Sequence, residues 1–301
     1  MVSFRYHLVS LGAVLLALAA GVVLGAGPLS GQVSKALSTP TAADSAAATG
    51  ETITGLKARV YAGDAYVAAT AKTLLAGQLK KTRVVLVVAP GTPPATVTAV
   101  ADLLTAAGAT VSGTVILAPA WFDPAQATVL NGITTQLAPA TTASTDGTPG
   151  SAASAALAAA LLSKTAGASA QTSDPATALL AGLIQGGFLT RTGQPDQGAS
   201  LAVLLAPATF KNQALLLPLL TGLDGAGKGA VVAAPAGSAA TGGVVALLRA
   251  DPTARATVSG IDSVDQPAGR VAVVLALAQQ KAGGHGQYGA GPGADAPVPK
   301  R

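Results

Sequence analysis

Two stretches of this chain show the same order of features, and this repeat constrains the fold more than any other property of the sequence. The first begins at Val84 with VVLVVAPGT, and the second begins at Leu201 with LAVLLAPAT. In each, an aliphatic run ends in Ala-Pro-x-Thr, a helix-like segment ends in Leu-Leu-Thr, and a second aliphatic run ends in Ala-Pro-Ala. Aliphatic strands that alternate with helices at this pitch predict right-handed βαβ units and a parallel sheet.

The rest of the chain after position 82 continues the same alternation, so we expect an α/β fold, a Rossmann-like parallel-sheet domain over 83–281 with two similar βαβ units. Strands are predicted in RVVLVVAP and TVSGTVIL and over 201–206, 229–234 and 256–261; helices are predicted over 94–107, 124–138, 152–164, 175–186, 211–223, 239–250 and 267–281. A loop is expected over 141–151. The last segment, 282–301, is rich in Gly and Pro, and we expect it to be a disordered tail.

The N-terminal segment runs from Leu8 to Leu29 without a charged residue. As a helix it would be about 33 Å long, against a hydrocarbon core of about 30 Å. A cleaved signal peptide is the alternative, but cleavage after Gly27 would place Pro28 directly behind the cut. We therefore expect 1–29 to form a cytoplasmic tip and an uncleaved transmembrane helix, with the protein in the cell membrane and its C-terminal domain outside the cytoplasm.

Small residues recur along this segment at Ala13, Ala17, Gly21 and Gly25. Gly21-x-x-x-Gly25 is a spacing that lets two membrane helices approach closely, although an Ala- and Gly-rich chain also produces it by chance. We expect homo-oligomers to form through the face of Gly21 and Gly25.

A linker and a helical stalk are expected over 30–82. Pro40 interrupts a small polar stretch, and the segment 51–81 then has helical character. Ile53, Val60, Val67 and Leu74 recur every seventh residue, but the matching second positions of the heptad include Gly63 and Gly77. Only half of a heptad seam is therefore present. The segment forms either a short dimeric coiled coil or a helix whose apolar stripe packs on the protein's own domain.

The composition removes several classes of chemistry. The chain has no Cys, one Met, and two His at positions 7 and 285, so it cannot form disulfides, thiolate metal sites or cysteine nucleophiles. Glu51 is the only glutamate, and the net charge of +5 comes from scattered residues without a basic, aromatic-rich stripe for nucleic acid. The Ala-Pro turns also lack a phosphate-binding glycine pattern. We expect no enzyme, no catalytic or cofactor-binding residues and no nucleic-acid partner.

Two local clusters remain as candidates. Asp262, Asp265 and Arg270 form the richest charged group, which suits either a hard cation or, at Asp265, the cap of the helix that follows. Trp121 and Phe122 follow a predicted strand and suit either a ligand platform or a plug in the core. The sequence leaves any metal-ligating residue unknown.

The two ends of the chain, VSFRYHLVSLGAVLLALAAGVVLGAGPLSG and VSGIDSVDQPAGRVAVVLALAQQKAGGHGQYG, resemble the actinobacterial MctB family, the mycobacterial copper transport protein B family, which includes SteB-like cell-envelope proteins. LLAGQLKKTRVVLVVAPGT and GTVILAPAWFDP fit the middle. The resemblance implies copper transport or homeostasis, with copper as the transported ion. It also implies an alternative, a coiled-coil scaffold that docks an envelope protein and regulates peptidoglycan hydrolases and division, and an alternative location in the outer membrane of a mycolate-bearing envelope.

Overall fold

The computed structural model describes residues 42–137, 150–165, 174–195 and 198–300. The chain divides into two units, Met1–Tyr61 and Ala62–Arg301, and the sheet and both cores belong to the second unit. The predicted membrane helix over 1–29, the Gly21–Gly25 pair and most of the 141–151 loop lie outside the described residues. Within the described ranges, no helix combines the length and the apolar character needed to cross a membrane.

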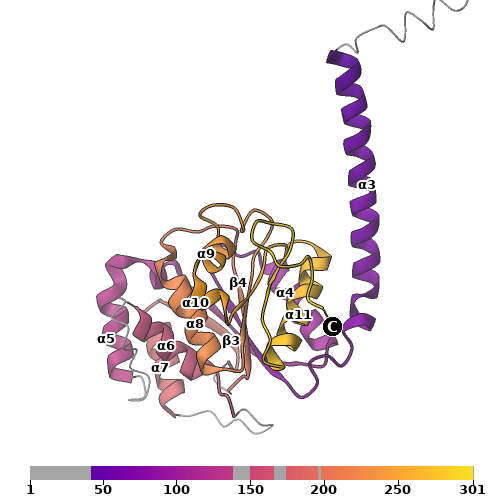
Figure 1. Cartoon of the computed structure of the whole chain (residues 1–301). Helices are drawn as coiled ribbons and strands as arrows, with labels where there is room; N and C mark the ends of the chain where they lie inside the picture. The colour runs from indigo at the N-terminus through magenta and orange to yellow at the C-terminus, as the bar shows by residue number, and fades with distance from the viewer. Residues whose placement is uncertain (1–41, 138–149, 166–173, 196–197, 301) are drawn as a thin grey trace, which may run out of the picture. The chain divides into compact units, whose positions relative to one another are not determined.

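A seven-stranded sheet forms the centre of the second unit, with strand order β3-β2-β1-β4-β5-β6-β7 (Figure 1). The strands are β1 (Arg83–Val88), β2 (Thr110–Leu117), β3 (Leu189–Gly193), β4 (Leu201–Leu205), β5 (Ala230–Ala233), β6 (Ser259–Ile261) and β7 (Gln287–Tyr288). All neighbouring pairs are parallel except β2 and β3, which are antiparallel. The central strands β4 and β5 are buried along their whole length, as expected for parallel strands covered on both faces.

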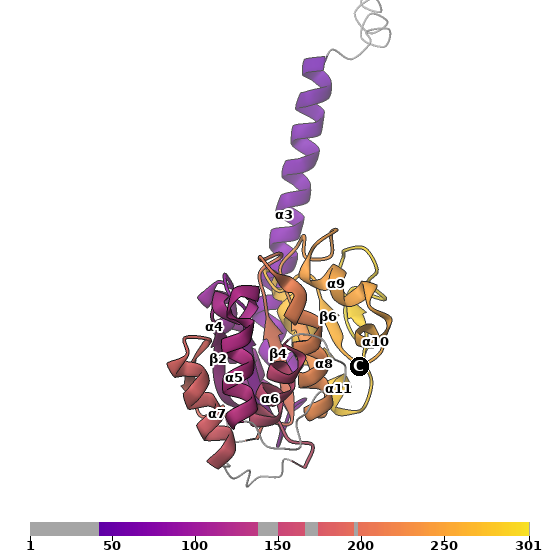
Figure 2. The same cartoon turned by 90° about the vertical axis from the view of Figure 1, so that its left-hand side faces the viewer.

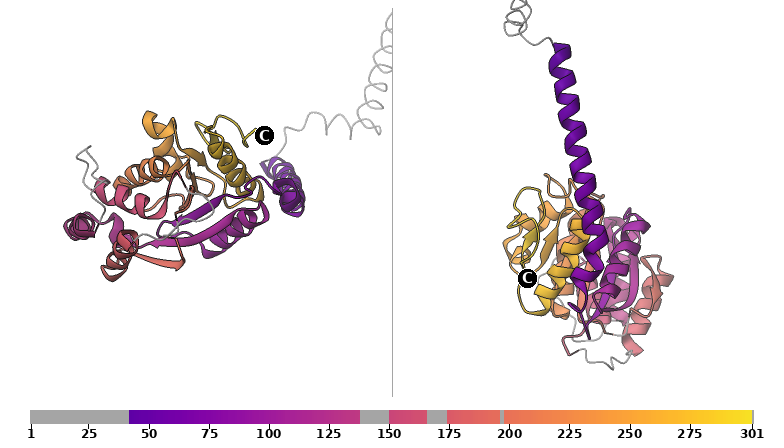
Figure 3. Two further views of the ribbon diagram at one scale, coloured as in Figure 1. Left: turned by 90° about the horizontal axis from the view of Figure 1, so that it is seen from below. Right: turned by 90° about the vertical axis from the view of Figure 1, so that its right-hand side faces the viewer.

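Helices cover both faces of the sheet. One layer consists of α5 (Ala127–Leu137), α6 (Ser151–Leu161), α7 (Asp174–Gln185), α8 (Leu216–Ala226) and α9 (Val244–Ala250), and it lies to the left of the strands in Figure 1 and faces the viewer in Figure 2. The other layer consists of α4 (Pro94–Ala106), α11 (Pro267–Lys281) and the end of α3 (Ala42–Leu75). Figure 3, right panel, shows this second layer with α11 in yellow. Short helices are η1 (Pro119–Phe122), η2 (Pro124–Gln126), η4 (Gln213–Leu215) and α10 (Pro252–Arg255).

The internal repeat folds as predicted into two βαβ units, β1-α4-β2 and β4-α8-β5. The two units start at the neighbouring strands β1 and β4 and run outward in opposite directions across the sheet. Because both crossovers follow the right-handed rule, their helices should cover opposite faces. The buried residues confirm this: Val100 and Leu104 of α4 lie in one core, and Leu219 and Leu223 of α8 lie in the other.

The antiparallel edge strand β3 was not predicted. Only its first residue, Leu189, is buried, and Thr190, Arg191 and Thr192 are exposed. A polar edge strand lacks the aliphatic run that marks the buried strands, so its sequence gave no strand pattern.

The expectation of a disordered tail over 282–301 is wrong for residues 282–300. After α11 the chain forms β7, which pairs in parallel with β6, and Tyr288 lies buried in the core with its hydroxyl donating to Gln279 Oε1. The glycines have a steric role. A Cβ at Gly289, whose φ is +130°, would lie 1.8 Å from Asp262 Oδ1, so only glycine lets the backbone pass there.

The stalk helix α3 begins at Ala42 and ends at Leu75, whereas the prediction placed it over 51–81. Near its end, Ala71 and Leu75 are buried in the core of the second unit, and Val67 is partly buried against it. Ile53, Val60 and Leu74 of the seven-residue repeat are 46%, 59% and 40% exposed. The end of the helix therefore packs on its own domain through a row that shares only Val67 with the seven-residue repeat, and the other residues of the repeat stay accessible.

Candidate functional site

Three Ala-Pro turns converge where the strand order reverses, between β1 and β4. Open α/β sheets bind ligands at this switch point, beyond the carboxyl ends of the strands. Here a pocket of about 570 Å³ lies between the turns that follow β1, β2 and β4. It is lined by Pro90, Gly91, Pro119, Ala120, Phe122, Asp123, Gln126, Phe210, Lys211 and Asn212.

Hydrogen bonds join the ends of β1 and β4 next to this pocket. Ala89 N–H donates to Leu205 O at 2.8 Å, and the Thr92 hydroxyl donates to Ala89 O at 2.8 Å and to Leu205 O at 3.1 Å. Thr92 is the threonine of the Ala-Pro-x-Thr motif, so the motif joins the end of β1 to the end of β4. Gly91 has a φ of +83°, which explains glycine in the turn.

The helix that follows β1 begins with two prolines. Pro93 is the N-cap of α4 and Pro94 is its first residue, and neither has a backbone N–H. Phosphate binding at a helix N-terminus needs several free N–H groups. The first turn of α4 is therefore poor in donors, as the sequence indicated for this turn.

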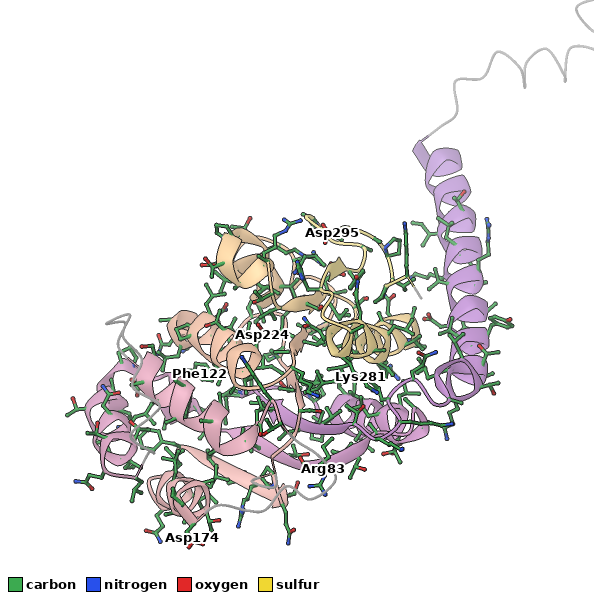
Figure 4. The ribbon with its side chains drawn as sticks, turned by 60° about the horizontal axis from the view of Figure 1, so that its bottom comes forward. Arg83, Phe122, Asp174, Asp224, Lys281 and Asp295 are labelled. Carbon is green, nitrogen blue, oxygen red and sulfur yellow. The ribbon has the colours of Figure 1, made fainter. Side chains whose placement is uncertain are left out.

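The two aromatic residues that follow β2, Trp121 and Phe122, have different surroundings. Trp121 is fully buried in the core, so the interpretation as a core plug is confirmed for it and the ligand platform is wrong. Phe122 is 4% exposed, and its ring packs edge-to-face on Phe210, with centroids 4.7 Å apart and planes at 63°. Both Phe rings line the pocket, and Figure 4 labels Phe122.

The rim of the pocket carries the polar groups. Asp123 Oδ1 accepts a hydrogen bond from Ala125 N–H at 3.0 Å and so caps η2. Lys211 and Asn212 are exposed, and Asn212 has left-handed backbone angles of φ 56° and ψ 56°. Sequence reasoning missed Phe210, Lys211 and Asn212, although they directly follow the predicted Ala-Pro-x-Thr turn of β4.

The carboxylates of the acidic cluster that the sequence offered for a cation accept hydrogen bonds from donors of the protein itself. Asp262 is 4% exposed and accepts from Arg249 Nη1 at 2.8 Å and from the N–H groups of Ala290 and Gly291 at 3.0 Å each. All these partners are donors, so the carboxylate holds the C-terminal segment in place. A pocket of about 400 Å³ lies beside Asp262. The carboxylate of Asp262 lines this pocket, but it already accepts the three hydrogen bonds named above.

Asp265 and Arg270 also differ from the expectation. The N-cap of α11 is Gln266, without a side-chain cap, so the predicted cap at Asp265 is wrong. Asp265 Oδ1 instead accepts from Ala236 N–H at 2.9 Å, in the loop after β5. Arg270 donates to the backbone oxygens of Val264 and Asp265. Across the described ranges, no three His, Asp or Glu residues come close enough to hold a metal ion.

The fold and the switch-point pocket define a Rossmann-like α/β protein whose strand-end turns are built from prolines rather than from a phosphate-binding loop. The chain belongs to the MctB family: the family model described as copper transport outer membrane protein, MctB, matches residues 1–299. It is similar to the copper transporter MctB of Mycobacterium tuberculosis (strain ATCC 25618 / H37Rv), with 31% identity over 310 residues and 98% of each chain covered. It is also similar to the copper transporter MctB of Mycobacterium leprae (strain TN), with 32% identity over 314 residues and 98% of each chain covered.

Proposed function

We propose that this protein serves copper transport or homeostasis in the cell envelope, as a non-enzymatic protein anchored by its N-terminal helix. One observation carries the proposal: the match to relatives named copper transporters extends over 98% of both chains and includes the anchor segment, the stalk and the α/β domain. The description of the family as outer membrane proteins supports an envelope location. The single apolar run favours the cell membrane as the place of this helix. An outer membrane is the alternative location.

The residues of the chain favour an indirect or shared handling of copper. Copper sites use Cys, Met and His ligands, and this chain has no Cys, one Met and two His. In the described part of the chain the only such residue is His285, which is exposed. A single chain therefore has too few soft ligands for a closed site, and we propose that copper passes through an assembly of several chains or is handled by a partner protein.

Deleting the gene tests this function. The deletion strain should accumulate more cell-associated copper than its parent and should grow less well in copper-supplemented medium, and the full-length chain should restore both. Elemental analysis of washed cells measures the copper, with cell-associated zinc as the matched control. Unchanged copper content together with unchanged copper tolerance would refute the proposal.

Self-association is the second part of the proposal. Ala13, Ala17, Gly21 and Gly25 would lie on one face of a helix, drifting about 40° per step. Small side chains there permit close backbone packing in lipid. The exposed Ile53 and Val60 then offer a weak seam in the stalk, which pairing of the anchors would strengthen by raising the effective concentration.

Replacing both Gly21 and Gly25 by Ile should therefore reduce the crosslinked dimer in membranes. Gly12→Ile is the matched control, because Gly12 lies nine positions before Gly21 and so on the opposite side of a helix, about 180° away. The control should leave the dimer yield unchanged. Equal yields from the double variant and the control would show that the spacing is a by-product of composition.

A further inference from the structure

We propose that the switch-point pocket binds a small organic anion, with an apolar body the size of one or two rings and a single negative charge. The inference rests on one juxtaposition: an apolar wall containing the Phe122–Phe210 pair stands beside Lys211, a cation without a partner among the described residues. This binding does not depend on copper.

The wall of the pocket suits an apolar body. Its volume of about 570 Å³ lies within the range of about 300–1,000 Å³ that is typical of small-molecule sites. Pro90 and Pro119 line the pocket and lack backbone N–H donors, and Ala120 adds a methyl group. The edge-to-face pair of Phe122 and Phe210 completes the wall with ring surface, which favours a flat or ring-shaped ligand.

The charged side chains at the rim of the pocket favour a ligand with a negative charge. Two charged residues line the pocket, Asp123 and Lys211. The Asp123 carboxylate is already engaged by Ala125 N–H, as the cap of η2. Lys211 forms no ion pair or hydrogen bond with any residue that the structure describes. Lys211 is therefore the charged side chain that is free to pair with a ligand, and it favours an anion. The Asp123 carboxylate keeps its own negative charge beside it, so one negative charge on the ligand is favoured over two.

Asn212 adds a polar group at the same rim. Its left-handed backbone costs free energy for a residue with a side chain, and such residues gather at ligand sites. Its side chain makes no capping hydrogen bond to η4, although it occupies the N-cap position. The amide is thus free to donate to an anion held by the neighbouring Lys211.

A matched pair of probes tests the proposal: naphthalene-2-carboxylate and its neutral analogue naphthalene-2-carboxamide, titrated calorimetrically into the full chain in lipid nanodiscs, with empty nanodiscs subtracted. The carboxylate should bind more tightly than the carboxamide. Lys211→Gln should weaken carboxylate binding about 2- to 5-fold, the range of a partly exposed ion pair, and leave carboxamide binding unchanged.

Two further variants sharpen the test. Asp123→Asn keeps a good capping residue and removes the competing charge, so it should strengthen carboxylate binding. Phe210→Ala should weaken both probes alike, and Phe210→Leu serves if the alanine variant unfolds. The proposal is wrong if neither probe binds at millimolar concentration, or if Lys211→Gln and Asp123→Asn leave the preference for the carboxylate unchanged.

Discussion

Asp262→Ala should lower the free energy of unfolding of the α/β domain by about 3–5 kcal/mol, because it leaves a buried guanidinium without its counter-charge. The side chains of Arg249 and Asp262 are 4% and 3% exposed and lie 2.8 Å apart. The remaining acceptors of Arg249 are backbone oxygens of the C-terminal segment, at Tyr288, Gly291 and Pro292. Chemical denaturation of the full chain, followed by circular dichroism, measures the loss.

Asp265→Ala is the matched control for this change. Asp265 is exposed and accepts one hydrogen bond from Ala236 N–H, so its loss should cost about 1 kcal/mol. If the two variants lose the same stability, the buried pair does not hold the C-terminal segment as described. A larger loss for Asp262→Ala, together with proteolysis beyond Lys281, would support the role of the pair.

Trp121→Ala should cost about 3–5 kcal/mol, the range for removing a large buried aromatic side chain. Trp121 is fully buried in the core, directly before Phe122. Its Nε1 makes no hydrogen bond to any described residue, so the indole contributes through packing alone. Trp121→Phe keeps part of this packing and removes the unsatisfied donor, so it should cost clearly less than the alanine variant.

Thermal unfolding of the unmodified chain, Trp121→Ala and Trp121→Phe separates these expectations. Far-ultraviolet circular dichroism is the signal, because both variants remove the one Trp of the chain and with it the Trp fluorescence. Equal losses for the Phe and Ala variants would mean that Nε1 has a partner that matters to stability. A negligible loss in both would contradict the description of Trp121 as part of the core.

The buried strands could be read from the sequence because parallel strands covered on both faces need continuous aliphatic runs. Each of β1, β4 and β5 satisfies that rule, and α11 matches its predicted bounds, 267–281. The edge strands β3 and β7 could not be found in this way. The composition of the C-terminal segment pointed to disorder. A side chain at Gly289 would collide with Asp262, and one at Gly291 would collide with Ala239 and Asp262, so both glycines have a steric role in an ordered segment.

The location of the pocket could be predicted from the sequence, but the side chains that line it could not. The Ala-Pro turns marked the carboxyl ends of β1, β2 and β4, where a ligand pocket was expected by rule. The side chains that fill it come from loops separated by many residues, and only the strand order brings Phe122 and Phe210 together. Asp262 and Asp265 are close in sequence, but they bind donors in different segments.

We propose that this member of the MctB family serves copper homeostasis without a tight copper site of its own. Titrating the full chain with Cu(I), in competition with a chromogenic chelator, tests this most directly. We predict no stoichiometric submicromolar binding, because the full chain has no Cys, one Met and two His, too few soft ligands for a closed site within one chain. The weak binding that remains should be reduced by His285→Ala. One Cu(I) bound per chain at submicromolar affinity would contradict this proposal.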